Sequence, residues 1–176
     1  MKKIIFIFVC VFATSNIFAQ SDAFKINPAA FFYSGFEIGY ETVAYEKDTA
    51  ELIFGYSNIK IDDSDIGLQT YAGEIRYKFN ISKEKIPFKG FYLAPALTYG
   101  EGTRKNTFQS PDKISFFGIG FLVGHQFKIK TNATSAFLID LNVGVSNFIT
   151  KSTPLLNDEK VKGIRPRAGI SFGYAF

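Results

Sequence analysis

Cysteine and histidine are almost missing from this sequence: Cys10 is the single cysteine and His125 the single histidine. Cys10 lies in a segment that we expect to be cleaved, so the mature chain has no disulfide and no thiol chemistry. One histidine without cysteine cannot assemble a zinc site of the usual kind. The basic residues form no long cluster, which argues against a nucleic-acid-binding protein.

Long apolar runs are also missing after the first 20 residues, so no transmembrane helix is expected there. The chain begins with Lys2 and Lys3 and an apolar run too short to span a bilayer, and Ala19 supplies a small residue for cleavage. We therefore predict a signal peptide over 1–19 and one domain over 20–176. Cleavage removes two lysines and lowers the net charge from +4 to +2.

What the chain has in abundance is alternation, most strictly at its end. Large side chains fall on Ile170, Phe172, Tyr174 and Phe176, with small residues between them. This period of two predicts a β-strand with one apolar face. The pattern resembles the C-terminal targeting strand of bacterial outer-membrane barrels, in which a terminal phenylalanine engages the insertion machinery. We interpret these four residues as a membrane-insertion signal, with that machinery as a partner during biogenesis.

Similar alternation recurs in segments near the ~9–11 residues that a tilted membrane strand needs. We expect strands over 23–32, 36–45, 50–61, 68–79, 88–100, 113–127, 135–149 and 162–176. One long strand over 23–45 would leave an odd count, which bacterial barrels avoid. Both termini then lie on one side, the periplasm. The expected turns there are 46–49, 80–87 and 128–134, and the expected external loops are 33–35, 62–67, 101–112 and 150–161.

The small residues between the apolar ones indicate which face meets lipid. A water-facing surface would be rich in lysine and glutamate, whereas glycine, alanine, serine and threonine suit the crowded lumen of a small barrel. We therefore predict an all-β, eight-stranded antiparallel up-and-down transmembrane β-barrel rather than a soluble lipocalin-like barrel. Tyrosines near strand ends on the apolar face suit an aromatic girdle. They are Tyr40, Tyr56, Tyr71, Tyr77 and Tyr99, together with Tyr174.

Charged residues that alternate with the apolar ones along each strand are expected to point into the barrel. Unpaired charge there would cost several kcal/mol, so these residues should form ion pairs. The predicted lumen network consists of Glu37, Glu41, Glu51, Glu74, Arg76, Lys78, Arg165 and Arg167, and Lys25 and Asp140 share its parity. Strand direction places Glu37, Arg165 and Arg167 toward the outer end. The network either fixes barrel register alone or belongs to a gated or binding lumen. An open porin channel is not expected at this strand number.

Catalytic and metal sites are weakly supported. His125 has lipid-facing parity, as in barrel enzymes that deacylate lipid A, but the position that should hold their serine is Phe127. A base without a nucleophile beside it cannot run that mechanism. Asp62, Asp63 and Asp65 fit a solvated loop better than a calcium site. We predict no enzyme activity, no cofactor and no metal.

Four short motifs give the chain a family resemblance. They lie at 25–28 (KINP), 36–41 (FEIGYE), 73–77 (GEIRY) and 90–100 (GFYLAPALTYG). In this order they resemble the small outer-membrane β-barrel proteins common in Bacteroidetes, including a domain-of-unknown-function group. The resemblance implies an eight-stranded barrel of the OmpA/OmpX type, and it transfers no catalytic residue.

The functional expectation is an integral outer-membrane barrel of a Gram-negative bacterium with a structural or interaction role, either envelope-stabilising or as an accessory subunit. Its expected partners are outer-membrane lipid and lipopolysaccharide, and a protein partner is expected to bind through external loops 101–112 and 150–161. Those loops carry cations that suit lipopolysaccharide phosphates: Arg104, Lys105, Lys151 and Lys160. The alternative is a barrel that binds or passes a small hydrophobic ligand, which needs an apolar pocket that the lumen charges disfavour. A lipid-modifying enzyme is the weakest alternative.

Overall fold

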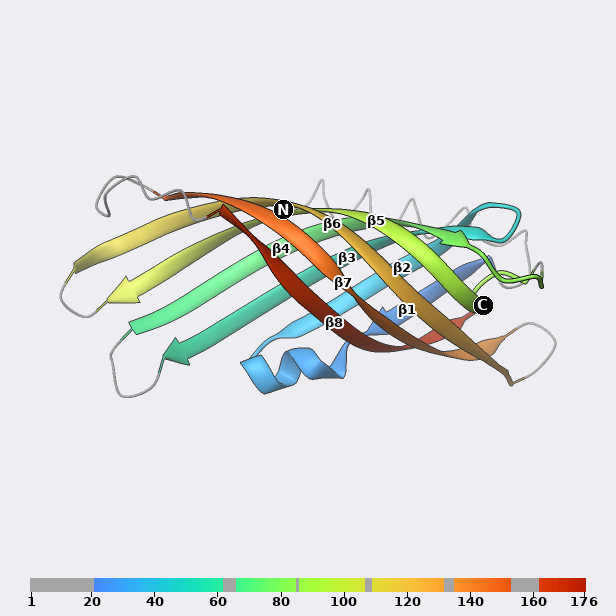
Figure 1. The fold of residues 1–176 in the computed structure, drawn as a ribbon. Helices are drawn as coiled ribbons and strands as arrows, with labels where there is room; N and C mark the ends of the chain where they lie inside the picture. The colour runs from blue at the N-terminus through green and yellow to red at the C-terminus, as the bar shows by residue number, and fades with distance from the viewer. Residues whose placement is uncertain (1–20, 62–65, 85, 107–108, 132–134, 153–161) are drawn as a thin grey trace, which may run out of the picture.

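The computed structural model describes residues 21–61, 66–84, 86–106, 109–131, 135–152 and 162–176. Eight antiparallel strands follow one another in sequence order around a closed barrel, and β1 pairs with β8 to close it (Figure 1). The strands are β1 (Asp22–Ile26), β2 (Phe36–Tyr45), β3 (Asp48–Ile61), β4 (Ile66–Asn80), β5 (Gly90–Asn106), β6 (Gln109–Lys130), β7 (Ala136–Ser152) and β8 (Lys162–Ala175). The predicted all-β, eight-stranded up-and-down architecture is confirmed.

The two ends of the barrel differ. We call the end that carries Asp22 and Ala175 the termini end, and the opposite end the loop end. In Figure 1 the strands β4 to β8 extend further toward the loop end than β1 and β2 do.

No helix among the described residues is both long and apolar enough to cross a membrane.

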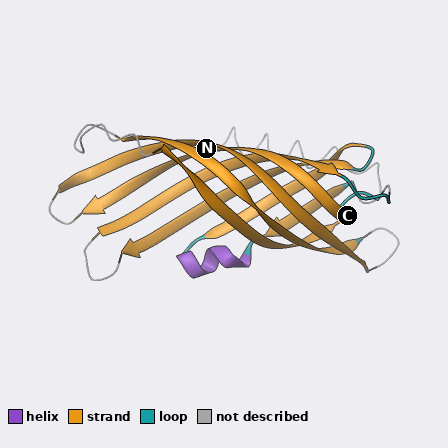
Figure 2. Ribbon diagram, in the orientation of Figure 1, coloured by secondary structure: helices purple, strands orange, loops and turns teal. Residues whose placement is uncertain are grey.

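The first strand is shorter than predicted. β1 ends at Ile26, and the 3-10 helix η1 (Pro28–Tyr33) follows it (Figure 2). Pro28 has no N–H for a strand ladder, and its ring fixes a φ that suits the first helical position. The side chain of Asn27 caps the helix, because its Oδ1 accepts a hydrogen bond from the Ala29 N–H at 3.0 Å. The prediction of a strand over 23–32 is therefore wrong beyond residue 26.

The external loop predicted over 101–112 is also wrong, because most of it is strand. β5 continues to Asn106, β6 begins at Gln109, and the ladder pairs Arg104 with Asp112. Glu101 and Thr103 occupy outward positions of β5 and are polar, so the apolar alternation ends before the ladder does. Most of the external loops predicted over 62–67 and 150–161 lies outside the described residues.

The short β1 leaves one edge of β8 unpaired toward the loop end. β8 pairs with β7 along its length, but with β1 only from Phe172 to Ala175. Pro166 falls within this stretch, and an edge strand tolerates its missing N–H. Helix η1 contacts β8 there. A small polar cavity of about 70 Å³ lies beside this edge, between the side chains of Asn27 and Arg167.

The barrel is apolar outside and charged inside. Large hydrophobic side chains are exposed on all eight strands, and Ile75 and Val143 have exposed fractions of 59% and 60%. The side chains buried in the interior include seven that carry charge: Lys25, Glu41, Glu51, Glu74, Arg76, Lys78 and Asp140. This distribution is the reverse of that in a globular protein, where charged residues are almost never buried and large apolar patches are rare on the surface.

Glycines on the inner face make room for aromatic rings from neighbouring strands. A Cβ at Gly124 would overlap the Tyr92 ring, and a Cβ at Gly118 would lie 2.5 Å from the nearest atom of the Phe148 ring. Each ring therefore occupies the space that the missing side chain leaves on the neighbouring strand. The Tyr92 ring has little freedom to move away, because its hydroxyl donates a hydrogen bond to Asp140 at 2.7 Å.

We expect Gly124→Ala to destabilise the folded barrel by about 1–3 kcal/mol, because the added methyl group displaces the Tyr92 ring in a tightly packed interior. The measurement is urea unfolding of the barrel in lipid vesicles. The matched control is Gly163→Ala, since a Cβ there meets no atom within 4 Å. Equal midpoints for the two variants would contradict this packing role of Gly124.

Candidate functional site

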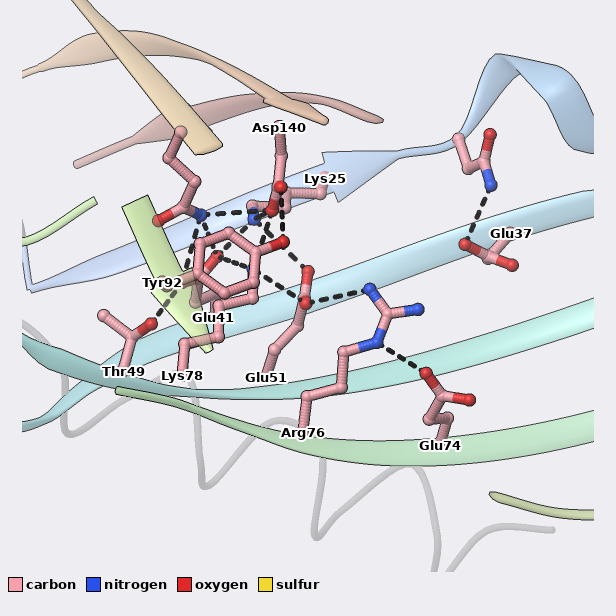
Figure 3. A network of polar contacts seen from close by, with 12 residues as sticks. Lys25, Glu37, Glu41, Thr49, Glu51, Glu74, Arg76, Lys78, Tyr92 and Asp140 are labelled. Atoms are coloured by element: carbon pink, nitrogen blue, oxygen red, sulfur yellow. Dashed lines mark hydrogen bonds and ion pairs between the residues drawn. The ribbon is translucent and has the colours of Figure 1, made fainter. Parts of the chain in front are cut away.

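Most of the buried polar side chains form one network that draws on every strand of the barrel. One residue from each strand suffices to trace it around the wall: Lys25, Glu41, Glu51, Arg76, Tyr92, Gln126, Asp140 and Arg167. Inward alternation on each strand brings these positions to the lumen. Figure 3 shows most of them converging in the interior.

Asp140 lies at the centre of the network and is fully buried. Its Oδ2 is 2.6 Å from Lys25 Nζ and 2.7 Å from Lys78 Nζ. Its Oδ1 accepts a hydrogen bond from the Tyr92 hydroxyl at 2.7 Å, and Gln126 Nε2 donates to Oδ2 at 3.2 Å. One carboxylate on β7 thereby contacts β1, β4, β5 and β6.

Two more carboxylates share the same ammonium groups. Glu41 forms ion pairs with Lys25 and, at 3.1 Å, with Lys78. Thr49 Oγ1 also donates to Glu41, and Gln126 Nε2 donates to its Oε2 at 2.8 Å. Glu51 lies 2.9 Å from Lys78 Nζ, 3.3 Å from Lys25 Nζ and 3.5 Å from Arg76.

A second layer lies toward the loop end and is centred on Glu74. Arg76 Nε donates to Glu74 at 2.5 Å, and Thr98 Oγ1 donates to it at 2.5 Å. Arg167 makes a bidentate contact with both oxygens of Glu74, at 2.7 and 3.0 Å, and donates to Ser146 at 3.2 Å. Arg76 contacts both Glu51 and Glu74, so it connects the two layers.

The network is balanced in charge. Its cations are Lys25, Arg76, Lys78 and Arg167, and its anions are Glu41, Glu51, Glu74 and Asp140. A buried charge is tolerated when it is paired and when hydrogen bonds satisfy its remaining polar atoms. Both conditions hold here, because hydroxyl and amide groups supply the additional donors. The arrangement can close the barrel and fix its register.

The network differs in detail from the sequence-based prediction. Glu41, Glu51, Glu74, Arg76, Lys78 and Arg167 lie in it, as do Lys25 and Asp140. Glu37 lies apart in Figure 3, where it accepts a hydrogen bond from Asn27 at 3.0 Å. Arg165 has an exposed side chain and pairs with no described residue. The prediction is therefore wrong for these two positions, which lie above the level at which the carboxylates gather.

The uncharged members of the network did not emerge from the sequence. Tyr92, Gln126, Thr49, Thr98 and Ser146 each donate or accept a hydrogen bond within it. All five share the inward parity of the charged residues on their strands. Parity alone would have included them, because every inward polar group of a narrow lumen needs a partner.

Three carboxylates of the network have the geometry of a metal site. Oxygen atoms of Glu41, Glu51 and Asp140 lie within 4.8 Å of one another. Such oxygens suit a hard cation such as Ca²⁺ or Mg²⁺. The ammonium groups of Lys25 and Lys78 already lie among them, so the lysines take the place that a metal ion would take.

The tyrosines predicted as a girdle all lie on strands with their rings on the outer face. Toward the loop end, Gln69 Nε2 donates to the hydroxyls of Tyr56 and Tyr71 at 3.1 and 3.2 Å, and Tyr99 donates to Glu101 at 2.9 Å. Toward the termini end, the Tyr40 hydroxyl donates to Asp22 at 2.6 Å. Tyr77 packs against Phe79, with ring centroids 4.7 Å apart.

The last strand presents its apolar side chains outward. Ile170, Phe172 and Tyr174 lie on β8, and Tyr174 packs against Phe137 with ring centroids 5.6 Å apart. Phe176 stacks on Phe24 with ring centroids 5.7 Å apart, and its N–H donates to the Asp22 carbonyl at 2.9 Å. The chain end is therefore held against β1.

His125 lies on the outer face of β6 between two aromatic rings. Its ring centroid is 4.4 Å from that of Phe91 and 4.3 Å from that of Phe127. Its Nδ1 has no hydrogen-bond partner among the described residues. The imidazole is thus held by packing, and it lines a surface cavity together with Ser82.

The fold and the site define a class: a closed eight-stranded antiparallel β-barrel whose lumen is crossed by a neutral ion-pair network. Within that class, the chain belongs to the family described as "Protein of unknown function (DUF3575)", whose model matches residues 4–145. The match ends within β7 and so does not include β8. Neither the curated proteins nor the solved structures gave a match to this chain.

We expect Asp140→Asn to destabilise the barrel by about 3–5 kcal/mol, because the network would then carry one unpaired buried positive charge. Adding Lys25→Met restores neutrality with a side chain of similar length, so the double variant should recover most of the loss. Urea unfolding in lipid vesicles measures both effects.

The control for charge removal is Glu84→Gln, which breaks the exposed ion pair between Glu84 and Lys89. It should change the stability by no more than about 1 kcal/mol. A double variant less stable than Asp140→Asn alone would contradict the charge-balance explanation.

Proposed function

We propose that this protein is an integral outer-membrane β-barrel of a Gram-negative bacterium, with both termini in the periplasm and a structural or interaction role. The observation that carries the proposal is the inverted distribution of side chains, with exposed apolar residues on all eight strands around a buried charged network. In lipid the apolar exterior is stable, and a closed barrel leaves few backbone groups unpaired.

The arrangement of aromatic residues supports the same location. The outer tyrosines lie toward both ends of the strands, with hydroxyls that reach Asp22, Gln69 and Glu101. Tyrosine favours the membrane interface because its ring is apolar and its hydroxyl is polar. The outward Phe172, Tyr174 and Phe176 suit a signal for the barrel-insertion machinery, and residues 1–19 suit a cleaved signal peptide. Residues 1–19 lie outside the described residues.

The lumen supports the proposed structural role. The ion-pair network crosses the barrel and joins all eight strands, which suits rigidity and opposes an open porin channel. The proposal includes no catalytic role, since Phe127 stands at the position where the lipid A deacylase pattern needs a serine. The proposed contacts of the barrel are therefore with outer-membrane lipid and lipopolysaccharide through its outer face.

A protein partner would bind at the loop end, through 101–112 and 150–161. In the first of these the ladder of β5 and β6 continues to the pair of Asn106 with Gln109, so most of this segment is strand rather than loop. The side chains of Arg104, Lys105, Lys151 and Lys160, expected to meet lipopolysaccharide phosphates, lie outside the described residues.

We expect the full chain to fractionate with the outer membrane and to migrate differently in electrophoresis before and after boiling, because a closed barrel resists detergent until heated. Removing Phe176 should lower the amount of the heat-modifiable form, since the insertion signal is weakened. The control is Phe176→Tyr, which keeps the terminal ring. Soluble periplasmic protein with one mobility in both samples would overturn the proposed location.

A further inference from the structure

A cavity of about 330 Å³ lies inside the barrel at the loop end, beyond the layer centred on Glu74. Its lining comes from five consecutive strands, β4 to β8, and four of the lining side chains are apolar: Leu68, Ile114, Phe116 and Phe148. Two threonines, Gly102 and Arg165 complete the wall. The sequence-based expectation that lumen charge disfavours an apolar pocket does not hold here, because the paired charges gather closer to the termini end.

The aromatic wall of this cavity is preformed. The rings of Phe116 and Phe148 meet edge to face, with centroids 6.0 Å apart and an interplanar angle of 74°. Each ring lies over a glycine of the neighbouring strand, Gly100 for Phe116 and Gly118 for Phe148. Binding sites for small molecules are typically concave, apolar and formed before the ligand arrives.

Arg165 is the charged residue in the described lining of this cavity, and no described residue pairs with its guanidinium. The cations of the network below are balanced by carboxylates, and Arg167 is engaged by both oxygens of Glu74. Arg165 makes no such pair, and its side chain is exposed toward the cavity that it lines. A guanidinium binds a carboxylate through two parallel hydrogen bonds.

We propose that this cavity binds a single-chain amphiphile with a carboxylate head, such as a medium-chain fatty acid. The hydrocarbon chain lies against Phe116 and Phe148, and the carboxylate pairs with Arg165. The volume is near the lower limit of roughly 300–1,000 Å³ for ligand pockets, so it suits one chain and excludes a two-chain lipid. The ligand enters from the loop end, because β4 to β8 form a continuous paired wall around it.

This site goes beyond the structural role proposed above. It uses only the part of the lumen beyond the Glu74 layer, so the network continues to close the barrel. The Arg165 guanidinium, rather than the buried cations, determines which head group is accepted. The site therefore predicts a preference for a carboxylate over an uncharged head on the same chain.

The test measures binding of radiolabelled decanoate and of decanol to the full chain in phosphatidylcholine vesicles, with empty vesicles subtracted. We expect saturable decanoate binding that Arg165→Gln weakens by at least about tenfold, as for a lost charge-assisted hydrogen bond. Binding of decanol should be nearly unchanged by that variant. The matched control is Lys130→Gln, which removes an exposed positive charge at the termini end and should leave both ligands unaffected.

A second variant tests the chamber itself. Thr150→Trp fills the cavity and should abolish binding of both ligands while the barrel still folds, as the heat-modifiable band reports. Decanoate binding that survives Thr150→Trp, equal losses for decanoate and decanol in Arg165→Gln, or no binding by the folded wild-type barrel would each overturn the proposal. A chain with no heat-modifiable form would instead contradict the membrane barrel, and the chamber with it.

Discussion

Asp140 and Glu41 share the ammonium groups of Lys25 and Lys78 in the middle of the barrel, and the rest of the structure depends on this contact. Charges buried in so narrow a space persist only when they are paired, so four strands must hold one register relative to one another. Once the charges are inside, alternation leaves the apolar side chains outside. The ion pairs that fix the register therefore also leave an apolar outer face, which suits an apolar environment.

Glycine links this constraint to the shape of the lumen. Gly124 admits the Tyr92 ring, whose hydroxyl completes the hydrogen bonding of Asp140. Further toward the loop end, Gly100 and Gly118 admit Phe116 and Phe148, which line a cavity together with Arg165. Glycines that make room for a ring of the neighbouring strand thus occur in two regions of the interior. One is the polar network that closes the barrel, and the other is the apolar chamber beyond it. A closed lumen and a binding cavity are compatible because they occupy different levels.

The sequence predicted the fold well, because alternation with a period of two persists along each strand. The prediction failed where the apolar alternation and the strand ladder end at different residues. Pro28 ends β1 early within an apolar stretch, and the β5–β6 ladder continues through polar residues. For the lumen, parity identified the charged residues and strand direction separated an upper from a lower group, but which side chains come into contact depends on the stagger of the strands. Glu37 and Arg165 were therefore assigned to a network that lies below them, and the chamber lined by Phe116 and Phe148 was missed.

The central claim is that the outer face of the barrel contacts lipid. The sequence contains no tryptophan, so the variant Val143→Trp places a single indole on the outer face of β7, at a position whose side chain is 60% exposed. In vesicles of lipids brominated near the bilayer centre, the account predicts strong quenching of this indole and little quenching by acrylamide from the water. Efficient quenching by acrylamide without an effect of the brominated lipids would contradict it.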